Sequence, residues 1–487
     1  MTAPRVPFEP GRLVMPALRW ADATGFAHEE AAIAEALEIG AGGFILFGGP
    51  ADAVRALTDD LRARAGRPLL VGADLERGAG QQFAGLTQFP PPRALASLPA
   101  AGGERAAAIR WAAGTTAHEA RGVGVNWVFA PVADLDVLPE NPIVQTRAFG
   151  DDPAVVSECV AAWIAGCQEA GALACAKHYP GHGRTARDSH AELPVVATDA
   201  ETLRRIDGAP FAAAAAAGVA SMMTAHVAYP ALDPIGRPAT FSGPILGDLR
   251  ARLGFDGLVV TDALIMEGAI VGRTEADAAV DAIAAGADIL LYPPAPRAVR
   301  DALARAVDAG TLPRARVDEA LTRYARAVER AETPPDAEAP AGPHASVARL
   351  ADRILAAGLV RGIAPSLAGP IELSIADDDV GGPYPASPSD HVERALSAES
   401  VRIGPGGSRV VLAFNEPRAW KGRAGFGPAA REALERHAPG ASLVVLFGHP
   451  RLVTEIPGAA PVLVAWHRQR LMQEAAAWWI RGRVTHP

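Results

Sequence analysis

From residue 11 to about residue 332, short apolar runs alternate with longer, alanine-rich amphipathic stretches. This alternation is typical of βα units that build a parallel sheet. Strands so apolar are expected to be buried on both faces, and eight of them separated by helices is the number that closes a TIM-type (β/α)8 barrel. We therefore expect an α/β chain in which residues 1–332 form such a barrel. The eight strand candidates are GRLVMPAL, GGFILFGG, PLLVGADLE, VNWVFAPVADL, ALACAKHYPG, ASMMTAHVAYP, DGLVVTDAL and DILLYPP.

A second domain is expected after a helix that runs from about Arg314 to Ala331. The segment that follows, TPPDAEAPAGPHAS, is rich in proline, alanine and glycine and has the composition of a linker. Beyond it, the runs PIELSIAD, RVVLAFNE, ASLVVLFGHP and APVLVAWH alternate with helical segments at 428–437 and 469–480. This pattern predicts a linker over residues 333–346 and a smaller α/β sandwich domain over residues 347–487.

Charge and hydropathy narrow the set of partners. The formal net charge of −9 disfavours nucleic acid, because the molecule as a whole repels a polyphosphate. The first 20 residues contain prolines and a glutamate where a signal peptide has an unbroken apolar stretch, and no run approaches ~20 apolar residues. We therefore expect a cytoplasmic protein that does not bind a membrane. Cys159, Cys167 and Cys175 are too few and too evenly spaced for a disulfide framework or a metal site, so we expect reduced core thiols.

Polar residues gather at the C-terminal ends of the predicted barrel strands. In a barrel these ends form the active-site face, so their side chains are expected to converge on one pocket. The alternative is that a carboxylate at such a position only caps the next helix. The residues concerned are Asp74, Glu76, Asp134, Asp136, Lys177, His178, His226 and Asp262.

The stretch KHYPGHGRTARDSH, residues 177–190, runs from the fifth strand into a loop. Lys177 and His178 are expected at the barrel mouth as hydroxyl-binding groups, and the glycines of PGHG are expected to let the rest of the loop move as a lid. Asp188 and His190 are two residues apart, so in an extended segment they face the same side and the carboxylate can orient the imidazole. A lone Asp-x-His on a loop is usually a surface pair, but three histidines and a lysine in one loop favour a proton-transfer dyad.

The run VVTDAL brings another carboxylate, Asp262, to the same face of the barrel. A retaining glycosidase needs a carboxylate that attacks the anomeric carbon, forms the covalent intermediate and stabilises an oxocarbenium-like transition state. Asp262 fits that need. The alternative is that Asp262 caps the following IMEGA segment.

Together these stretches resemble glycoside hydrolase family 3, and within it the bacterial N-acetyl-β-glucosaminidases of peptidoglycan recycling. The resemblance covers residues 11–332 and rests on the lysine-histidine pair, the Pro-Gly-His-Gly run and the Asp-Ser-His triplet of KHYPGHGRTARDSH. It implies that His190 is the general acid/base, Asp188 its partner, and Asp262, within TDALIM, the nucleophile. Relatives outside this subgroup mostly use a carboxylic acid of the second domain as acid/base, so the triplet points to N-acetylglucosaminides.

The same resemblance implies which residues bind the sugar. Asp74, within ADLE, resembles the family aspartate that binds sugar hydroxyls, and Arg147, within NPIVQTRAFG, resembles the family's substrate-binding arginine. Lys177 and His178 complete this expected sugar site.

The chain departs from the family pattern beyond the strand that carries the hydroxyl-binding aspartate. Glu76 is followed by Arg77 where relatives have two glycines, and Gln82 stands where relatives have an arginine. These departures concern contacts beyond the non-reducing sugar, so the natural aglycone stays open.

The resemblance implies a retaining exo-β-N-acetylglucosaminidase that acts on soluble muropeptide or chitooligosaccharide fragments without a metal or an organic cofactor. Two alternatives on the same fold remain: an N-acetylglucosaminide phosphorylase that uses the same Asp/His pair, and a family 3 β-glucosidase or β-xylosidase. A Schiff-base aldolase built on Lys177 is an alternative from another class, but the Pro-Gly-His-Gly loop has no role in it. A non-catalytic sugar-binding protein conflicts with the presence of both His190 and Asp262.

Overall fold

The computed structural model describes residues 7–189, 191–270, 273–334, 346–378, 386–418 and 421–485. The chain forms two compact units. The first comprises Met1–Thr87, Ile109–Val137 and Gly150–Ala341, and the second comprises Gln88–Ala108, Leu138–Phe149 and Gly342–Pro487. Two stretches from the N-terminal half of the chain thus group with the C-terminal residues. The linear boundaries proposed at residues 332 and 347 stay a prediction.

The first unit contains a curled sheet of seven strands, whose order in space is their order in the chain. Every neighbouring pair runs parallel. Beside this sheet β1 (Val14–Met15) pairs with β9 (Leu290–Leu291), and an isolated bridge joins Val260 to Ile289. The seven strands are β2 (Ala17–Arg19), β3 (Gly43–Phe47), β4 (Leu70–Ala73), β5 (Trp127–Val128), β6 (Leu173–Tyr179), β7 (Ser221–Thr224) and β8 (Leu258–Val260).

These strands confirm the predicted parallel α/β fold. Each of the eight predicted runs contains an observed strand, and the first run contains both β1 and β2. Strands β4, β6, β7 and β8 are buried along their whole length, as their continuous apolar character requires.

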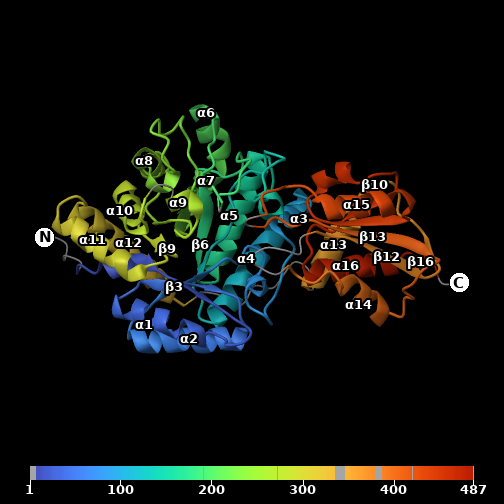
Figure 1. Ribbon diagram of the computed structural model, residues 1–487, viewed down its shortest axis with the longest axis horizontal. Helices are drawn as coiled ribbons and strands as arrows, with labels where there is room; N and C mark the ends of the chain where they lie inside the picture. Colours follow the sequence, from blue (N-terminus) through green and yellow to red (C-terminus); the bar gives the residue numbers. More distant parts are fainter. Residues whose placement is uncertain are drawn as a thin grey trace. The chain divides into compact units, whose positions relative to one another are not determined.

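Helices lie around the strands of the first unit, and β3, β6 and β9 are seen in the middle of that unit (Figure 1). Helix α4 begins in the second unit and ends in the first. The helices are α1 (Glu30–Glu38), α2 (Ala51–Ala65), α4 (Glu104–Gly122), α5 (Pro153–Glu169), α6 (Ala200–Thr202), the π-helical turn η6 (Leu203–Asp207), α7 (Ala209–Ala216), α8 (Gly243–Ala251), α9 (Glu267–Ile270), α10 (Glu275–Ala285), α11 (Pro296–Asp308) and α12 (Arg314–Glu332).

Helix α5 shows how the sequence sets these elements. Pro153 occupies its first turn, and the Asp152 side chain caps it by accepting hydrogen bonds from the Ala154 and Val155 amides at 2.8 and 3.1 Å. Its inner face contains two of the three cysteines. All three are free and buried, as predicted, and burial raises the pKa of the Cys167 and Cys175 thiols to about 12.

The second unit is built on a five-stranded sheet in the order β10-β15-β14-β13-β12. Four of its strands are parallel, and β10 is antiparallel to β15. A separate two-stranded pair joins β11 (Leu367–Ala368) to β16 (Val484–Thr485). The sheet strands are β10 (Leu359–Arg361), β12 (Ile371–Ala376), β13 (Ser408–Phe414), β14 (Leu443–Phe447) and β15 (Val462–Val464).

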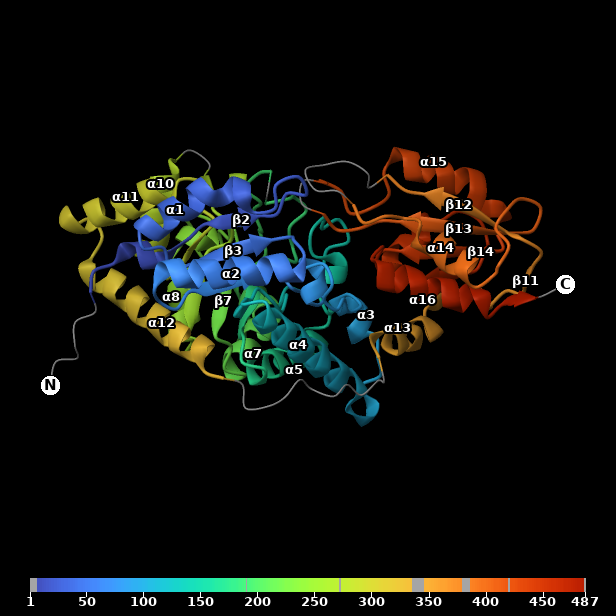
Figure 2. The same cartoon turned by 90° about the horizontal axis from the view of Figure 1, so that it is seen from below.

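Helices cover both faces of this second sheet. Helix α15 lies on one face and α14 and α16 lie on the other, in both views (Figures 1 and 2). The four predicted strand runs and the two predicted helices of this region are present. The helices of the second unit are α3 (Pro92–Ala96), α13 (Val347–Ala356), α14 (His391–Ala398), α15 (Pro428–His437) and α16 (Arg470–Arg481).

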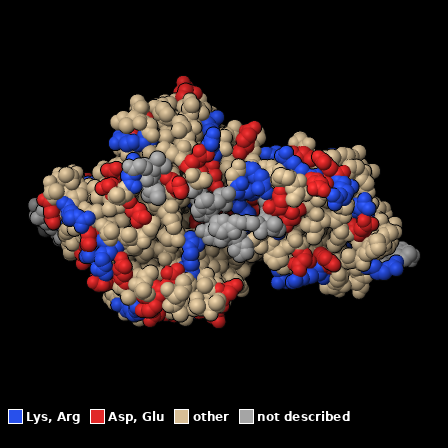
Figure 3. Space-filling view, viewed as in Figure 1, with Lys and Arg blue, Asp and Glu red and all other residues tan. Residues whose placement is uncertain are grey.

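The molecular surface is mixed in charge. On the face shown in Figure 3, acidic and basic side chains are interspersed over both units. Within the described ranges, the structure contains no helix that has both the length and the apolar character needed to cross a membrane.

Candidate active site

Three alternate strands of the first unit, β4, β6 and β8, bring predicted polar residues to one edge of its sheet. Asp74 directly follows β4, Lys177 and His178 lie near the end of β6, and Asp262 follows β8 by two residues. Because these strands are parallel, their carboxyl ends lie at the same edge. The structure therefore brings together four of the seven residues that the sequence predicts for the site.

Lys177 is held between two carboxylates. Its ammonium nitrogen Nζ lies 2.7 Å from Asp74 Oδ1 and 2.7 Å from Glu76 Oε1. The side chains of Lys177 and Glu76 are buried, whereas that of Asp74 is 32% exposed. Both ion pairs engage the ammonium group of Lys177, whereas a Schiff base requires a free, neutral amine. This contact therefore argues against the aldolase alternative.

The buried thiol of Cys175 shows that the site residues share one electrostatic environment. Burial is the main cause of its raised pKa, Lys177 lowers that pKa, and both Asp74 and Asp262 raise it. Cys175 lies on β6, whose side chains contribute to the core inside the curled sheet. Asp74, Lys177 and Asp262, which lie at or just beyond the ends of three different strands, therefore all influence the pKa of this buried thiol.

Asp134 organises the two histidines that follow Lys177. Its fully buried carboxylate lies 2.7 Å from His178 Nδ1 through Oδ2, and its Oδ1 accepts hydrogen bonds from the backbone amides of His178 and His182 at 3.1 and 2.7 Å. Because the carboxylate can only accept, His178 donates from Nδ1 and presents Nε2 as its remaining polar atom. The sequence placed Asp134 on the active-site face but assigned it no role.

The loop after β6 is tightly packed in this structure. Gly181 has a φ of +131°, and its carbonyl accepts a hydrogen bond from Tyr229 Oη at 2.8 Å. A Cβ atom at Gly183 would lie only 1.7 Å from the carbonyl oxygen of Leu135. Gly181 therefore supplies a backbone conformation that other residues rarely adopt, and Gly183 permits a close backbone approach. The lid motion that the sequence suggested for this loop stays a prediction.

His182 joins the two ends of this loop. Its Nδ1 lies 2.8 Å from Thr185 Oγ1 and its Nε2 lies 2.9 Å from Ser189 Oγ. Burial, with a further contribution from His178, lowers the pKa of His182 to about 4. The imidazole is therefore neutral at pH 7, and one nitrogen donates while the other accepts.

The pKa of His182 makes the stability of the first unit depend on pH. An unfolded histidine titrates near 6.5 and the folded one near 4, so the stability present above pH 6.5 is lost as the pH falls towards 4. We expect this residue to cost on the order of 2 kcal/mol between pH 7 and pH 5. His182→Gln, which keeps a donor and an acceptor but does not titrate, should show a smaller fall in Tm over that range by calorimetry. A fall equal to that of the wild type would contradict the assignment of a neutral, buried imidazole.

The structure describes Asp188 but not His190. The Asp188 side chain is buried, and the Asp188 carbonyl accepts hydrogen bonds from the Ala191 and Glu192 amides at 3.0 and 3.2 Å. His190 lies outside the described residues. The Asp188–His190 dyad therefore stays a prediction.

Asp262 lies in a short segment that is fixed from two sides. Its Oδ1 accepts the Ala263 amide at 2.8 Å, and the Ala263 carbonyl accepts His226 Nε2 at 3.2 Å. The next residue, Leu264, donates its amide to the Leu291 carbonyl at 2.9 Å. The Asp262 side chain is half-buried, and no helix begins at the next residue, since α9 starts at Glu267. This arrangement does not match the helix-cap alternative.

A salt bridge to a residue outside the 177–190 motif fixes the loop after β6. Arg184 Nε lies 2.9 Å from both carboxylate oxygens of Asp207, which is buried on η6. Burial raises the pKa of Asp207, and Arg184 opposes that shift. Sequence reasoning missed Asp207, because no local pattern indicates that η6 contacts the loop.

The remaining predicted residue, Arg147, belongs to the second unit. There its Nη1 donates to the Ile143 carbonyl at 3.3 Å. A role for Arg147 in substrate binding stays a prediction. Gln82, at the position of the family arginine, lies in the first unit and accepts the Gly48 amide at 3.1 Å through Oε1.

A second feature that the sequence missed lies at the carboxyl ends of β2, β3 and β9. Arg19 Nε donates to Tyr292 Oη at 3.0 Å, and its guanidinium carbon lies 4.0 Å from the centre of the Phe47 ring.

Among the described residues, no group of three or more His, Cys, Asp or Glu side chains is arranged to hold a metal ion.

More than half of the chain matches a known family. Residues 13–327 match the domain described as the glycosyl hydrolase family 3 N-terminal domain. A β-hexosaminidase of Thiobacillus denitrificans is 38% identical over 271 residues, which cover 54% of this chain and 74% of that protein. A β-N-acetylglucosaminidase/β-glucosidase of Cellulomonas fimi is 35% identical over 283 residues, which cover 56% of this chain and 49% of that protein.

Solved structures are similar over nearly the whole chain. A glycoside hydrolase family 3 β-N-acetylglucosaminidase from Paenibacillus sp. str. FPU-7 has a TM-score of 0.82 and 26% identity, and the match covers 99% of this chain and 97% of that one. A β-glucoside phosphorylase has a TM-score of 0.83 and 21% identity, with 99% of this chain and 93% of that one covered. At 21% identity the second similarity concerns the fold alone.

Proposed function

Because the chain belongs to glycoside hydrolase family 3, we propose that it is a retaining exo-β-N-acetylglucosaminidase. Its similarity to β-hexosaminidases supports β-N-acetylglucosaminidase activity at the level of the enzyme class. The retaining mechanism and the muropeptide or chitooligosaccharide substrate are the parts that we add. We also propose a cytoplasmic location and a closed (β/α)8 barrel. The β1–β9 pair and the Val260–Ile289 bridge support the closed barrel.

One observation carries this proposal most directly. Asp262 follows β8 at the same edge of the sheet as the Asp74–Lys177 pair, and no helix begins directly after it. A half-buried carboxylate at the same sheet edge as the two groups that we assign to hydroxyl binding supports Asp262 as the group that attacks the sugar.

The proposed reaction divides the work among these residues. Asp74 and Lys177 bind hydroxyls of the terminal sugar, since Lys177 is fixed by Glu76 while Asp74 remains partly exposed. His178 presents Nε2 to the same sugar because Asp134 holds its Nδ1. These contacts orient the anomeric carbon towards the nucleophile.

The chemistry then takes two steps. In the first, Asp262 attacks the anomeric carbon, the glycosidic bond breaks, and protonated His190 gives its proton to the departing oxygen. In the second, neutral His190 takes a proton from water, the water oxygen attacks the anomeric carbon, and the bond to Asp262 breaks. Asp188, as the partner of His190, favours the imidazolium form needed for the first step.

Product analysis tests the proposed function. We expect 4-nitrophenyl N-acetyl-β-glucosaminide to give free N-acetylglucosamine at the same rate with and without phosphate, and the β-anomer should form first by NMR. The matched 4-nitrophenyl β-glucoside should react much more slowly. Formation of a sugar 1-phosphate only when phosphate is present would identify a phosphorylase instead, and preference for the glucoside would identify a β-glucosidase.

A further inference from the structure

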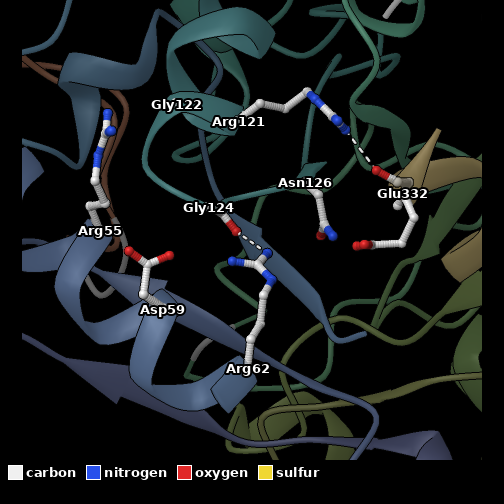
Figure 4. Close-up of a pocket in the computed structure, with 9 residues that line it drawn as sticks. Arg55, Asp59, Arg62, Arg121, Gly122, Gly124, Asn126 and Glu332 are labelled. Atoms are coloured by element: carbon white, nitrogen blue, oxygen red, sulfur yellow. Dashed lines mark hydrogen bonds between the residues drawn. The ribbon is translucent and has the colours of Figure 1, made fainter. Parts of the chain in front are cut away.

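A cavity of about 290 Å³ opens in the first unit away from the candidate active site. Figure 4 shows Arg55, Arg62 and Asp59 on α2, and Arg121 and Glu332 approaching from the ends of α4 and α12. The remaining lining residues are Gly122, Gly124, Asn126 and Ala331.

The cavity lies at the amino-terminal edge of the sheet. Asn126 immediately precedes β5, whereas Asp74 and Asp262 follow the carboxyl ends of β4 and β8. Because the strands are parallel, these positions are at opposite edges. A ligand in the cavity therefore cannot reach the groups assigned to catalysis.

Two of the guanidinium groups are fixed by backbone carbonyls. Arg62 Nη2 donates to the Gly124 carbonyl at 2.6 Å, and Arg121 Nη1 donates to the carbonyls of Gly171 and Ala331 at 2.7 Å each. Each guanidinium has five N–H donors, so most of them remain available to a ligand. Fixed donors of this kind lower the entropic cost of binding.

Gly124 is required for this arrangement. Its φ is +81°, and an added Cβ atom would lie 2.1 Å from Thr58 Oγ1 and 2.6 Å from Arg62 Nη1. The backbone thus makes room for the Arg62 guanidinium beside it. An arginine side chain that is free to move on the surface would not require a glycine beside its guanidinium group.

The charges in the cavity are held apart. Among the described residues, none of the three arginines lies within 4.0 Å of Asp59 or Glu332, although Figure 4 shows the Glu332 carboxylate directed towards Asn126 and Arg62. Burial lowers the pKa of Arg62. The charges of Glu332 and Asp59 raise that pKa, and the charge of Arg121 lowers it. The cavity therefore combines three cations with two anions that do not neutralise them by contact.

These groups select a particular class of ligand. Guanidinium groups bind carboxylate and phosphate oxygens through paired hydrogen bonds. Two carboxylates repel a bare anion but accept hydrogen bonds from hydroxyl groups. The volume is at the lower end of the roughly 300–1,000 Å³ that is usual for small-molecule sites. A small molecule with both an anionic group and hydroxyls satisfies all three conditions.

We propose that this cavity is a second, non-catalytic binding site for a small hydroxylated anion of the sugar phosphate or sugar acid class. The anionic group lies against Arg62, Arg121 and Arg55, and the hydroxyls donate to Glu332 and Asp59. The bound ligand joins α2 to the ends of α4 and α12.

Calorimetric titration of the full chain tests this site, with glucose 6-phosphate, glucuronate, inorganic phosphate and glucose as probes. N-acetylglucosamine is present throughout to occupy the candidate active site. We expect glucose 6-phosphate, glucuronate or both to bind more tightly than phosphate or glucose. Arg55→Ala should weaken that binding about 10-fold or more, because Arg55 is exposed and its loss removes a charged partner of the anion. Turnover of the nitrophenyl substrate should be unchanged.

Arg64→Ala is the matched control, because Arg64 lies on α2 but outside the cavity, where it pairs with Glu30 and Asp60. It should change the affinity less than about 2-fold. Arg62→Lys should also weaken binding, since it keeps the charge but loses the planar donor pair. The proposal is overturned if neither hydroxylated anion binds at millimolar concentration, if Arg64→Ala weakens binding as much as Arg55→Ala, or if inorganic phosphate binds as tightly as the tighter of the two hydroxylated anions.

Discussion

Replacing Asp262 with asparagine should reduce turnover of 4-nitrophenyl N-acetyl-β-glucosaminide by roughly 10³-fold or more. Asparagine has nearly the same shape as aspartate, so the amide of Ala263 still finds an acceptor at this position. It lacks the negative charge that attacks the anomeric carbon and stabilises the oxocarbenium-like transition state. The rate should therefore fall while the circular dichroism spectrum and Tm stay close to those of the wild type.

Asp308→Asn is the matched control, because Asp308 is an exposed carboxylate at the end of α11 in the same unit. Its turnover should equal that of the wild type. A second test uses Asp262→Ala with added azide, which should restore product release as a glycosyl azide if the missing group is the nucleophile. Near-wild-type turnover of Asp262→Asn would show that another residue attacks the sugar.

The fold of the first unit was accessible from sequence because its strands are buried on both faces. Such strands form continuous apolar runs, and all eight runs contain strands in the structure. Their lengths were less predictable. The run from Val125 to Leu135 yields the two-residue strand β5 and an isolated bridge at Val132, and Pro131 between them has no amide proton to donate to the ladder.

The division into units was not accessible in the same way. Residues 88–108 and 138–149 group with the C-terminal part of the chain, although they lie between strands of the first sheet in the sequence. Hydrophobic periodicity reports which face of an element is buried, but it does not report which partner covers that face. Arg147 belongs to one of these stretches, so its place in the structure could not be derived from its position in the sequence relative to the 177–190 motif.

The candidate site shows the same limit at the level of single side chains. Asp74, Lys177, His178 and Asp262 could be found because strand ends have a defined place in a parallel sheet. Their supporting groups depend on contacts between distant segments. Asp207 reaches Arg184 from η6, and Asp134 holds two histidines that lie more than 40 positions away in the sequence. Residues of this second kind carry no motif, because any carboxylate at the right place in space serves.

The role of His190 leads to a prediction that depends on the leaving group. A general acid matters most when the departing oxygen is strongly basic, as in a disaccharide, and matters little for a nitrophenolate, which leaves without protonation. His190→Ala should therefore slow the glycosylation step on N,N′-diacetylchitobiose by roughly 10²–10⁴-fold. The same step on the nitrophenyl substrate should slow by less than about 10-fold.

Pre-steady-state kinetics are needed to see this difference, because His190 also acts as the base in the second step. In His190→Ala that second step becomes slow, so the steady-state rate on the nitrophenyl substrate reports release of the sugar. Under those conditions a burst of nitrophenolate should precede a slow steady state in His190→Ala. His118→Ala is the matched control, since His118 is an exposed histidine on α4, and it should leave both substrates unaffected. Equal losses on the disaccharide and the nitrophenyl sugar in the first step would mean that another group protonates the departing oxygen. In that case the Asp-Ser-His triplet would serve to hold the buried loop, through the Ser189–His182 hydrogen bond, and would take no part in proton transfer.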